Sequence, residues 1–148
     1  MHNALFHKIK LIRFSSDGAA TSAIEFAMLA PIFVLMILGM SAYGIYFGAS
    51  HSVQQIAADA ARTAISGLDQ SERQLLVTAF VQRNAHGYPF IDPAKLSVTA
   101  RDSAADTDQF VVAVRYDARG LPIWNLLSDL PLPGTTITRS STIRIGGL

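Results

Sequence analysis

The 148-residue sequence contains no cysteine, and only 16% of its residues are charged. The absence of cysteine excludes disulfide bonds, thiolate catalysis and thiolate metal sites. Typical soluble domains contain about 25% charged residues, so this chain is poor in charge. Twelve Lys and Arg residues against eleven Asp and Glu residues give a net charge of +1. A chain so evenly balanced has no basic field to hold nucleic acid, and we expect no nucleic-acid partner.

The hydrophobic residues, half of the total, are concentrated in one segment. Residues 26–50 form a run of twenty-five residues without a formal charge. About 20 apolar residues in a helix cross the hydrocarbon core of a bilayer, and at 1.5 Å per residue this run reaches about 37 Å. Core helices of soluble proteins rarely stay uncharged for so long. The sequence therefore predicts one transmembrane helix, with Tyr43, Tyr46 and Phe47 at the membrane interface near its end.

The charges that flank this segment predict its orientation. Lys8, Lys10 and Arg13 precede it, whereas the first Lys or Arg after it is Arg62. Because basic residues are enriched on the cytoplasmic side, we expect a cytoplasmic N-terminus and an extracytoplasmic C-terminal part. The apolar run begins too late, and is too long, for an ordinary secretory signal peptide.

Glu25 stands directly before the apolar run. An ionisable group in a membrane costs about 2.5–3.5 kcal/mol at the centre of a span and less near its end. Glu25 therefore either lies among the lipid headgroups or meets a positive partner. No Lys or Arg lies within one helical turn of it in the sequence. A new α-amino group at Thr21, four residues upstream, would supply the charge because it is largely protonated at neutral pH.

Residues 20–31, which contain Glu25 and Phe26, resemble the N-terminal signature of TadE-like proteins. Residues 54–64 are similar to the alanine-rich continuation of the TadE helix. The resemblance implies a non-enzymatic pseudopilin of a tight-adherence (Flp, type IV) pilus assembly and secretion system, in which Glu25 and Phe26 are the candidate assembly residues. It also implies a single-pass protein of the bacterial inner membrane.

The family pattern further implies that a prepilin peptidase removes the basic leader by cutting after a small residue. Four residues separate Ala20 from Glu25, as in the family pattern, so we expect cleavage between Ala20 and Thr21. Glycine is usual before the cut, and cleavage between Gly18 and Ala19 is the second choice. The implied partners are the prepilin peptidase, other pseudopilins, the major pilin and the inner-membrane assembly platform. No cofactor is implied.

Small residues recur every four positions in and after the predicted span, at Gly44, Gly48 and Ser52. Small residues with this spacing let two helices approach closely. The same pattern arises by chance in apolar helices, so a helix–helix contact and a chance occurrence stay open as interpretations.

The remaining sequence predicts an α+β fold. Apolar residues continue at helical spacing past residue 50, and residues 71–74 resemble a capping box that opens a second helix. Residues 96–101, 110–116 and 135–145 have the alternation or the Thr and Ile content of strands, which predicts an antiparallel sheet of about three strands. We therefore divide the chain into a cytoplasmic leader (1–20), a transmembrane helix (21–50) that continues into the next part, and an extracytoplasmic domain (51–148).

The sequence shows no motif for catalysis or metal binding. The four histidines lack metal-ligand spacing, and Asp102, Asp106 and Asp108 lack the glycine turn and final glutamate of a calcium loop. Trp124 fits either a core anchor or an exposed partner contact. Two alternatives to a pseudopilin remain. One is an uncleaved single-pass protein with a ligand-binding or sensory outer domain, and the less favoured one is a membrane-anchored enzyme.

Overall fold

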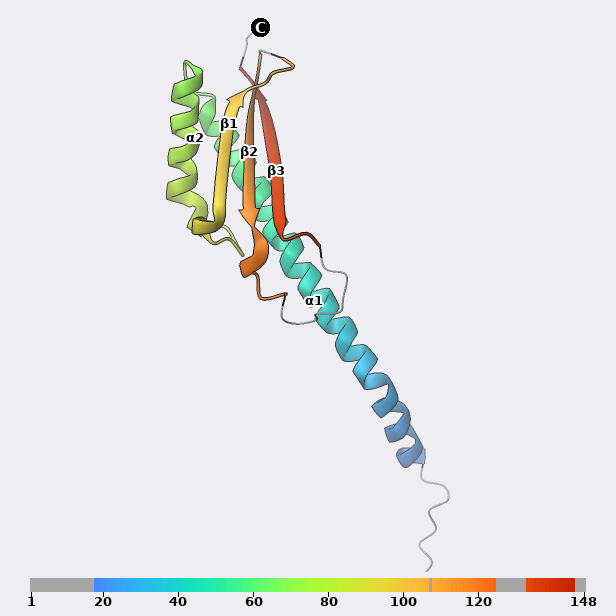
Figure 1. The fold of residues 1–148 in the computed structure, drawn as a ribbon. Coiled ribbons are helices and arrows are strands. Elements are labelled where there is room, and N and C mark those ends of the chain that lie inside the picture. Colours follow the sequence, from blue (N-terminus) through green and yellow to red (C-terminus); the bar gives the residue numbers. More distant parts are fainter. Residues whose placement is uncertain (1–17, 107, 125–132, 146–148) are drawn as a thin grey trace, which may run out of the picture. The chain divides into compact units, whose positions relative to one another are not determined.

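A computed structural model of the chain describes residues 18–106, 108–124 and 133–145. A long apolar helix is followed by a second helix and a three-stranded antiparallel sheet, so the predicted α+β fold is confirmed (Figure 1). The chain divides into two compact units, Met1–Met36 and Ile37–Leu148. The basic leader residues Lys8, Lys10 and Arg13 lie outside the described residues.

Helix α1 comprises Gly18–Ala64 and continues through Pro31. Its most apolar window has a mean hydropathy of 2.2, and none of that window is buried within the chain. Large side chains such as Phe26 and Met28 are 72% and 73% exposed. Since apolar surface in water costs about 25 cal/mol per Å², so many exposed side chains favour a hydrocarbon environment. The helix is long and apolar enough to cross a membrane.

The C-terminal part of α1 has a different character, because one of its faces is buried. The buried residues are mostly alanines that recur at helical spacing: Ala49, Val53, Ile56, Ala57, Ala60, Ala61 and Ala64. Alanine has no side chain beyond Cβ, so the helix backbone approaches its neighbours closely. This face forms one hydrophobic core with the buried residues of the sheet.

Helix α2 comprises Gln70–Asn84 and begins with a capping box. The Glu72 N–H donates to Asp69 Oδ1 over 2.8 Å, and Glu72 Oε2 in return accepts from the Leu68 N–H over 2.8 Å. The prediction that Ser71 opens the cap is therefore wrong by two residues. Asp69 takes this role because its carboxylate is a strong acceptor, and the Ser71 hydroxyl donates to the same oxygen over 2.5 Å.

The sheet is an antiparallel meander of β1 (Leu96–Asp102), β2 (Gln109–Asp117) and β3 (Thr136–Arg144), in that order. The three predicted strands are confirmed. Alternate residues of the central strand are at most 2% exposed, and they are Phe110, Val112, Val114 and Tyr116. In Figure 1, α2 lies alongside β1 and the upper part of α1 passes behind the sheet.

Each edge of the sheet is tied to a helix by a glutamine. Gln74 of α2 donates to the Ala100 carbonyl of β1 over 2.8 Å. Gln54 of α1 donates to the Ser140 carbonyl of β3 over 3.4 Å, and Arg139 of β3 donates to the Ser50 hydroxyl of α1 over 2.6 Å. Edge strands carry unpaired backbone groups, so these contacts both protect the edges and fix the helices against the sheet.

Candidate functional site

The predicted processing site lies at the start of α1. Gly18, Ala19 and Ala20 are its first residues, and Thr21 and Glu25 are both exposed in the next turn. Residues four apart share one face of a helix, and helical side chains point back toward the N-terminus. A glutamate at position 25 that follows this general trend has its carboxylate near the turn that begins at Thr21. Within the described residues, Glu25 has no ion pair.

Aromatic side chains gather on α1 at the end of its apolar segment. The ring of Phe47 lies 6.2 Å from that of Tyr43 and 6.2 Å from that of Tyr46. Phe47 is 57% exposed. Aromatic residues favour the interface between hydrocarbon and water, which agrees with the end of the span expected from the sequence.

The three small residues with four-residue spacing have different surroundings. At Gly44, a Cβ atom would have no neighbour within 4 Å, so this position is open. At Gly48, a Cβ atom would lie 2.7 Å from Cε2 of the Phe90 ring. Ser52 is only 3% exposed. Within the chain, Gly48 and Ser52 thus already face other residues, and a contact with another helix stays a prediction.

Asp59 connects α1 to the segment that follows α2. The Tyr88 hydroxyl donates to Asp59 Oδ2 over 2.8 Å, while Arg62 pairs with Oδ1 over 2.9 Å. Burial, with the hydrogen bond and the negative charge of Asp59, raises the pKa of Tyr88 to about 12. Asp59 and Arg62 belong to the alanine-rich stretch that suggested the family, and this contact was not predicted.

Arg73 is a buried charge at the start of α2, with 8% of the residue exposed. Its guanidinium carbon lies 5.5 Å from the centre of the Phe110 ring. Its Nη2 lies 4.0 Å from Oδ1 of Asp102, and neither that oxygen nor Arg73 Nε has a hydrogen-bond partner. The cation–π contact and the distant carboxylate together compensate the buried charge only in part.

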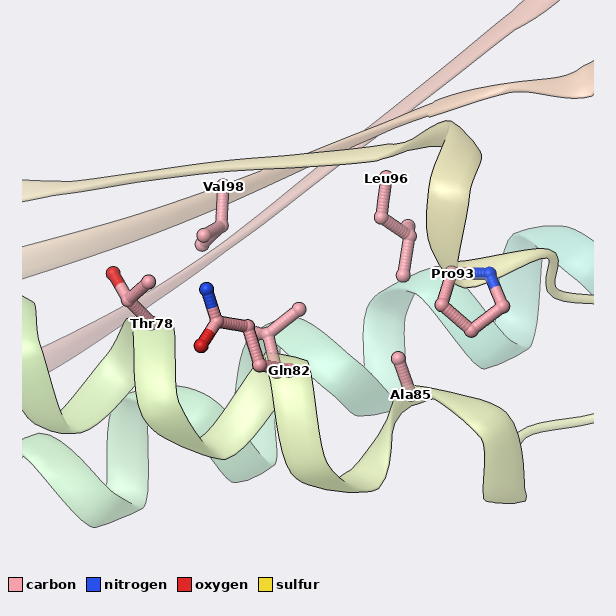
Figure 2. A pocket seen from close by; sticks show the side chains of 7 residues that line it. Thr78, Gln82, Ala85, Pro93, Leu96 and Val98 are labelled. Atoms are coloured by element: carbon pink, nitrogen blue, oxygen red, sulfur yellow. The ribbon is translucent and has the colours of Figure 1, made fainter.

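A pocket of about 350 Å³ lies between α2 and β1. Figure 2 shows Thr78 and Gln82 of the helix facing Val98 and Leu96 of the strand, with Pro93 at one end. Its lining consists of Thr78, Val81, Gln82, Ala85, Pro93, Leu96 and Val98. One hydroxyl and one amide are the polar side-chain groups in this set, so the pocket offers no acid, base or metal ligand for a reaction.

Asp102, Asp106 and Asp108 surround the hairpin between β1 and β2, and Asp106 supports its turn. The two oxygens of Asp106 accept from the Asp108 N–H over 3.0 Å and from the Gln109 side chain over 2.8 Å. Among the described residues, no group of three or more His, Asp or Glu side chains is arranged to hold a metal. These contacts explain Asp106 as a loop-forming residue.

Trp124 is half-buried and packs against the hydrophobic core. Its indole N–H donates to the Ala118 carbonyl over 2.6 Å. Of the two interpretations left open by the sequence, the structure supports the core anchor.

Comparison with known proteins gives one family. The family model described as TadE-like protein matches residues 20–62. No curated protein and no solved structure matches the chain. The matched residues begin at Ala20, include Glu25, Phe26 and the apolar helix, and end at Arg62. The resemblance noted in the sequence is confirmed over these residues. The TadE-like family is a structural and assembly family associated with tight-adherence pilus systems. From Ala20 to Arg62, which is less than half of its length, the chain is similar to the TadE-like family.

Proposed function

We propose that this protein is a pseudopilin-like component of a tight-adherence pilus assembly and secretion system, processed by a prepilin peptidase. The observation that carries the proposal is the TadE-like match itself, because it includes Glu25 and the part of α1 whose most apolar window is unburied. In a pilus subunit such a helix has two successive environments. It lies in the membrane before assembly and beside the helices of other subunits afterwards.

Helix geometry favours cleavage between Ala20 and Thr21. A new α-amine at Thr21 would stand one turn before Glu25 on the same helix face. An α-amine at Ala19 would stand six residues before Glu25 and about 120° away around the helix. Ion pairs are stronger where water is excluded, and they also need the two charges to be close. An α-amine at Thr21 is therefore a better counter-charge for the Glu25 carboxylate than one at Ala19. The amine comes from the same chain or from a neighbouring subunit.

In this function the basic leader stays in the cytoplasm, α1 spans the inner membrane and the sheet lies outside. The leader is the substrate of the prepilin peptidase. The remaining chain joins other pseudopilins, the major pilin and the assembly platform in the inner membrane.

Mass spectrometry of the mature protein tests this function. The full-length gene is expressed in cells with and without an active prepilin peptidase, and the N-terminus of the membrane-extracted protein is determined. We expect a start at Thr21, or at Ala19 as second choice, only in cells with the peptidase. A chain that still begins at Met1 in those cells contradicts the proposal and favours the uncleaved single-pass protein with a ligand-binding or sensory domain.

A further inference from the structure

Phe90 is an exposed aromatic residue held in an unusual backbone conformation. Its φ angle is 62°, and among the described residues no other non-glycine residue has a positive φ. This left-handed conformation costs a bulky L-residue about 1–2 kcal/mol, so the surrounding structure must hold it. Nevertheless, the residue is 52% exposed. The strain therefore does not serve to bury the ring.

A core tyrosine maintains this conformation. The hydroxyl of Tyr116, a residue 2% exposed on β2, donates to the Phe90 carbonyl over 3.2 Å. The same hydroxyl accepts from the Asp92 N–H over 3.4 Å. Both sides of the Phe90 turn are thus tied to the centre of the sheet, which fixes the direction in which the ring projects.

The ring projects to α1, at the height of its aromatic cluster. The Phe90 Cε2 and Cδ2 atoms would lie 2.7 Å and 2.9 Å from a Cβ at Gly48, so only glycine admits the ring in this position. Gly48 directly follows Phe47, which is 57% exposed. At 1.5 Å per residue, Gly48 lies only about 7.5 Å along the helix axis from Tyr43. Phe90 therefore joins Tyr43, Tyr46 and Phe47 within this short interval.

We propose that Phe90 is a membrane anchor, which the folded part of the chain inserts into the headgroup region where α1 leaves the bilayer. The partner is the lipid surface, because the Phe90 ring lies against α1 at Gly48, next to the part of the helix that enters the membrane. The headgroup region on each side of the hydrocarbon is about 5–8 Å thick, which matches the interval occupied by the four aromatic residues. Together they form one aromatic belt contributed by two distant parts of the sequence. This inference rests on the membrane insertion of α1 in the proposed function.

The absence of cysteine from the natural chain permits a direct measurement of depth. Three full-length variants, Phe90→Cys, Phe47→Cys and Leu68→Cys, are spin-labelled and reconstituted in vesicles of phosphatidylethanolamine and phosphatidylglycerol. Leu68 is 90% exposed beside the N-terminus of α2 and serves as the aqueous control. The ratio of collisions with oxygen to collisions with a water-soluble nickel complex reports the lipid environment of each label.

We expect severalfold higher ratios at positions 47 and 90 than at position 68. A high ratio at 47 with a ratio at 90 equal to that at 68 overturns the anchor and leaves the membrane span intact. A low ratio at 47 overturns the span, and with it both the proposed function and the anchor.

A second readout avoids the loss of the aromatic ring. Phe90→Trp in a Trp124→Phe background contains one tryptophan, since the natural chain has only one. Its fluorescence is expected to fall severalfold more in vesicles of brominated lipid than that of Leu68→Trp in the same background, because Leu68 is the aqueous control position. Equal quenching of the two tryptophans contradicts the anchor.

Discussion

The Tyr88 hydroxyl donates a 2.8 Å hydrogen bond to Asp59 Oδ2, and this bond joins the TadE-like helix to a segment outside the family match. Asp59 is held on its other side by Arg62, three residues further along the same helix. The bond is thus a tertiary contact that fixes the alanine-rich part of α1 against the turn after α2.

Removal of this hydroxyl by Tyr88→Phe is expected to destabilise the fold by about 1 kcal/mol, the usual net value of one hydrogen bond. The pKa of Tyr88 is raised from 10.0 to about 12 in the folded chain. Its contribution to stability is therefore complete below pH 10 and is lost as the pH rises through about 12. Thermal unfolding of the detergent-solubilised protein at several pH values measures both effects. Arg62→Ala is the control, because its exposed ion pair with Asp59 is worth less than about 1 kcal/mol.

Gly67 is required for close packing, and Gly67→Ala is expected to be destabilising. A Cβ at this position would lie 2.7 Å from Arg73 Cγ and 2.9 Å from the Arg73 backbone nitrogen. Because the backbone of α2 cannot move aside cheaply, we expect a loss of about 1–3 kcal/mol, or several degrees in the unfolding temperature. Gly87→Ala is the matched control, since a Cβ there meets no atom within 4 Å. Equal effects of the two substitutions would contradict this explanation.

The buried charge of Arg73 and the Asp102 carboxylate are expected to be coupled in their effect on stability. Arg73→Met is expected to destabilise the fold by about 2 kcal/mol, because it leaves the Asp102 carboxylate without a counter-charge in a partly buried site. Asp102 is 37% exposed, which keeps this loss below that of a fully buried pair. In the double variant Arg73→Met, Asp102→Asn, both charges are removed, and we expect recovery of at least half of the loss. Chemical denaturation of Arg73→Met, Asp102→Asn and the double variant measures the coupling, and strictly additive effects would refute it.

The fold was predictable from the sequence because its elements carry strong periodic signals. The apolar run, the alternation in β1 and β2 and the Thr and Ile content of β3 each reflect one local environment along a whole element. The cap of α2 was misplaced because Asp69 and Ser71 are both good capping residues and only the geometry selects between them.

The contacts that connect distant segments were not predictable. The residues next to Phe90 in the sequence do not predict its positive φ angle. This conformation is held by a hydrogen bond from Tyr116, which lies 26 residues further along the chain. Tyr88 likewise finds Asp59 across 29 residues. In the candidate site, Glu25 could be identified from the sequence alone. A charged residue beside a long apolar run is energetically costly in a membrane, and this cost does not depend on the rest of the fold.

Of the three small residues Gly44, Gly48 and Ser52, Gly44 is the one at which a Cβ atom would meet no other residue of the chain. We predict that the α1 helices of two copies contact each other at this position. In membranes, cysteine cross-linking between copies carrying Met40→Cys reports such a contact, since Met40 lies one turn before Gly44 and is 69% exposed. Adding Gly44→Leu is expected to reduce the cross-linked fraction severalfold by separating the helices. Gly39→Leu, about 140° around α1 from Gly44 and at a partly buried position, is the comparison variant. A similar yield in all three proteins would exclude this contact.

Loss of the Glu25 charge is expected to block assembly without blocking insertion. Both Glu25→Ala and Glu25→Gln remove the partner of the α-amine, whereas Glu25→Asp retains it with a shorter side chain. Because an ion pair shielded from water exceeds 1.4 kcal/mol, we expect at least about a tenfold fall in assembled pili for the first two variants and a smaller fall for the third. Extraction of membranes at alkaline pH checks that all variants are inserted, and mass spectrometry checks that they are cleaved. Normal piliation with a cleaved and inserted Glu25→Gln protein would show that the carboxylate has no part in assembly.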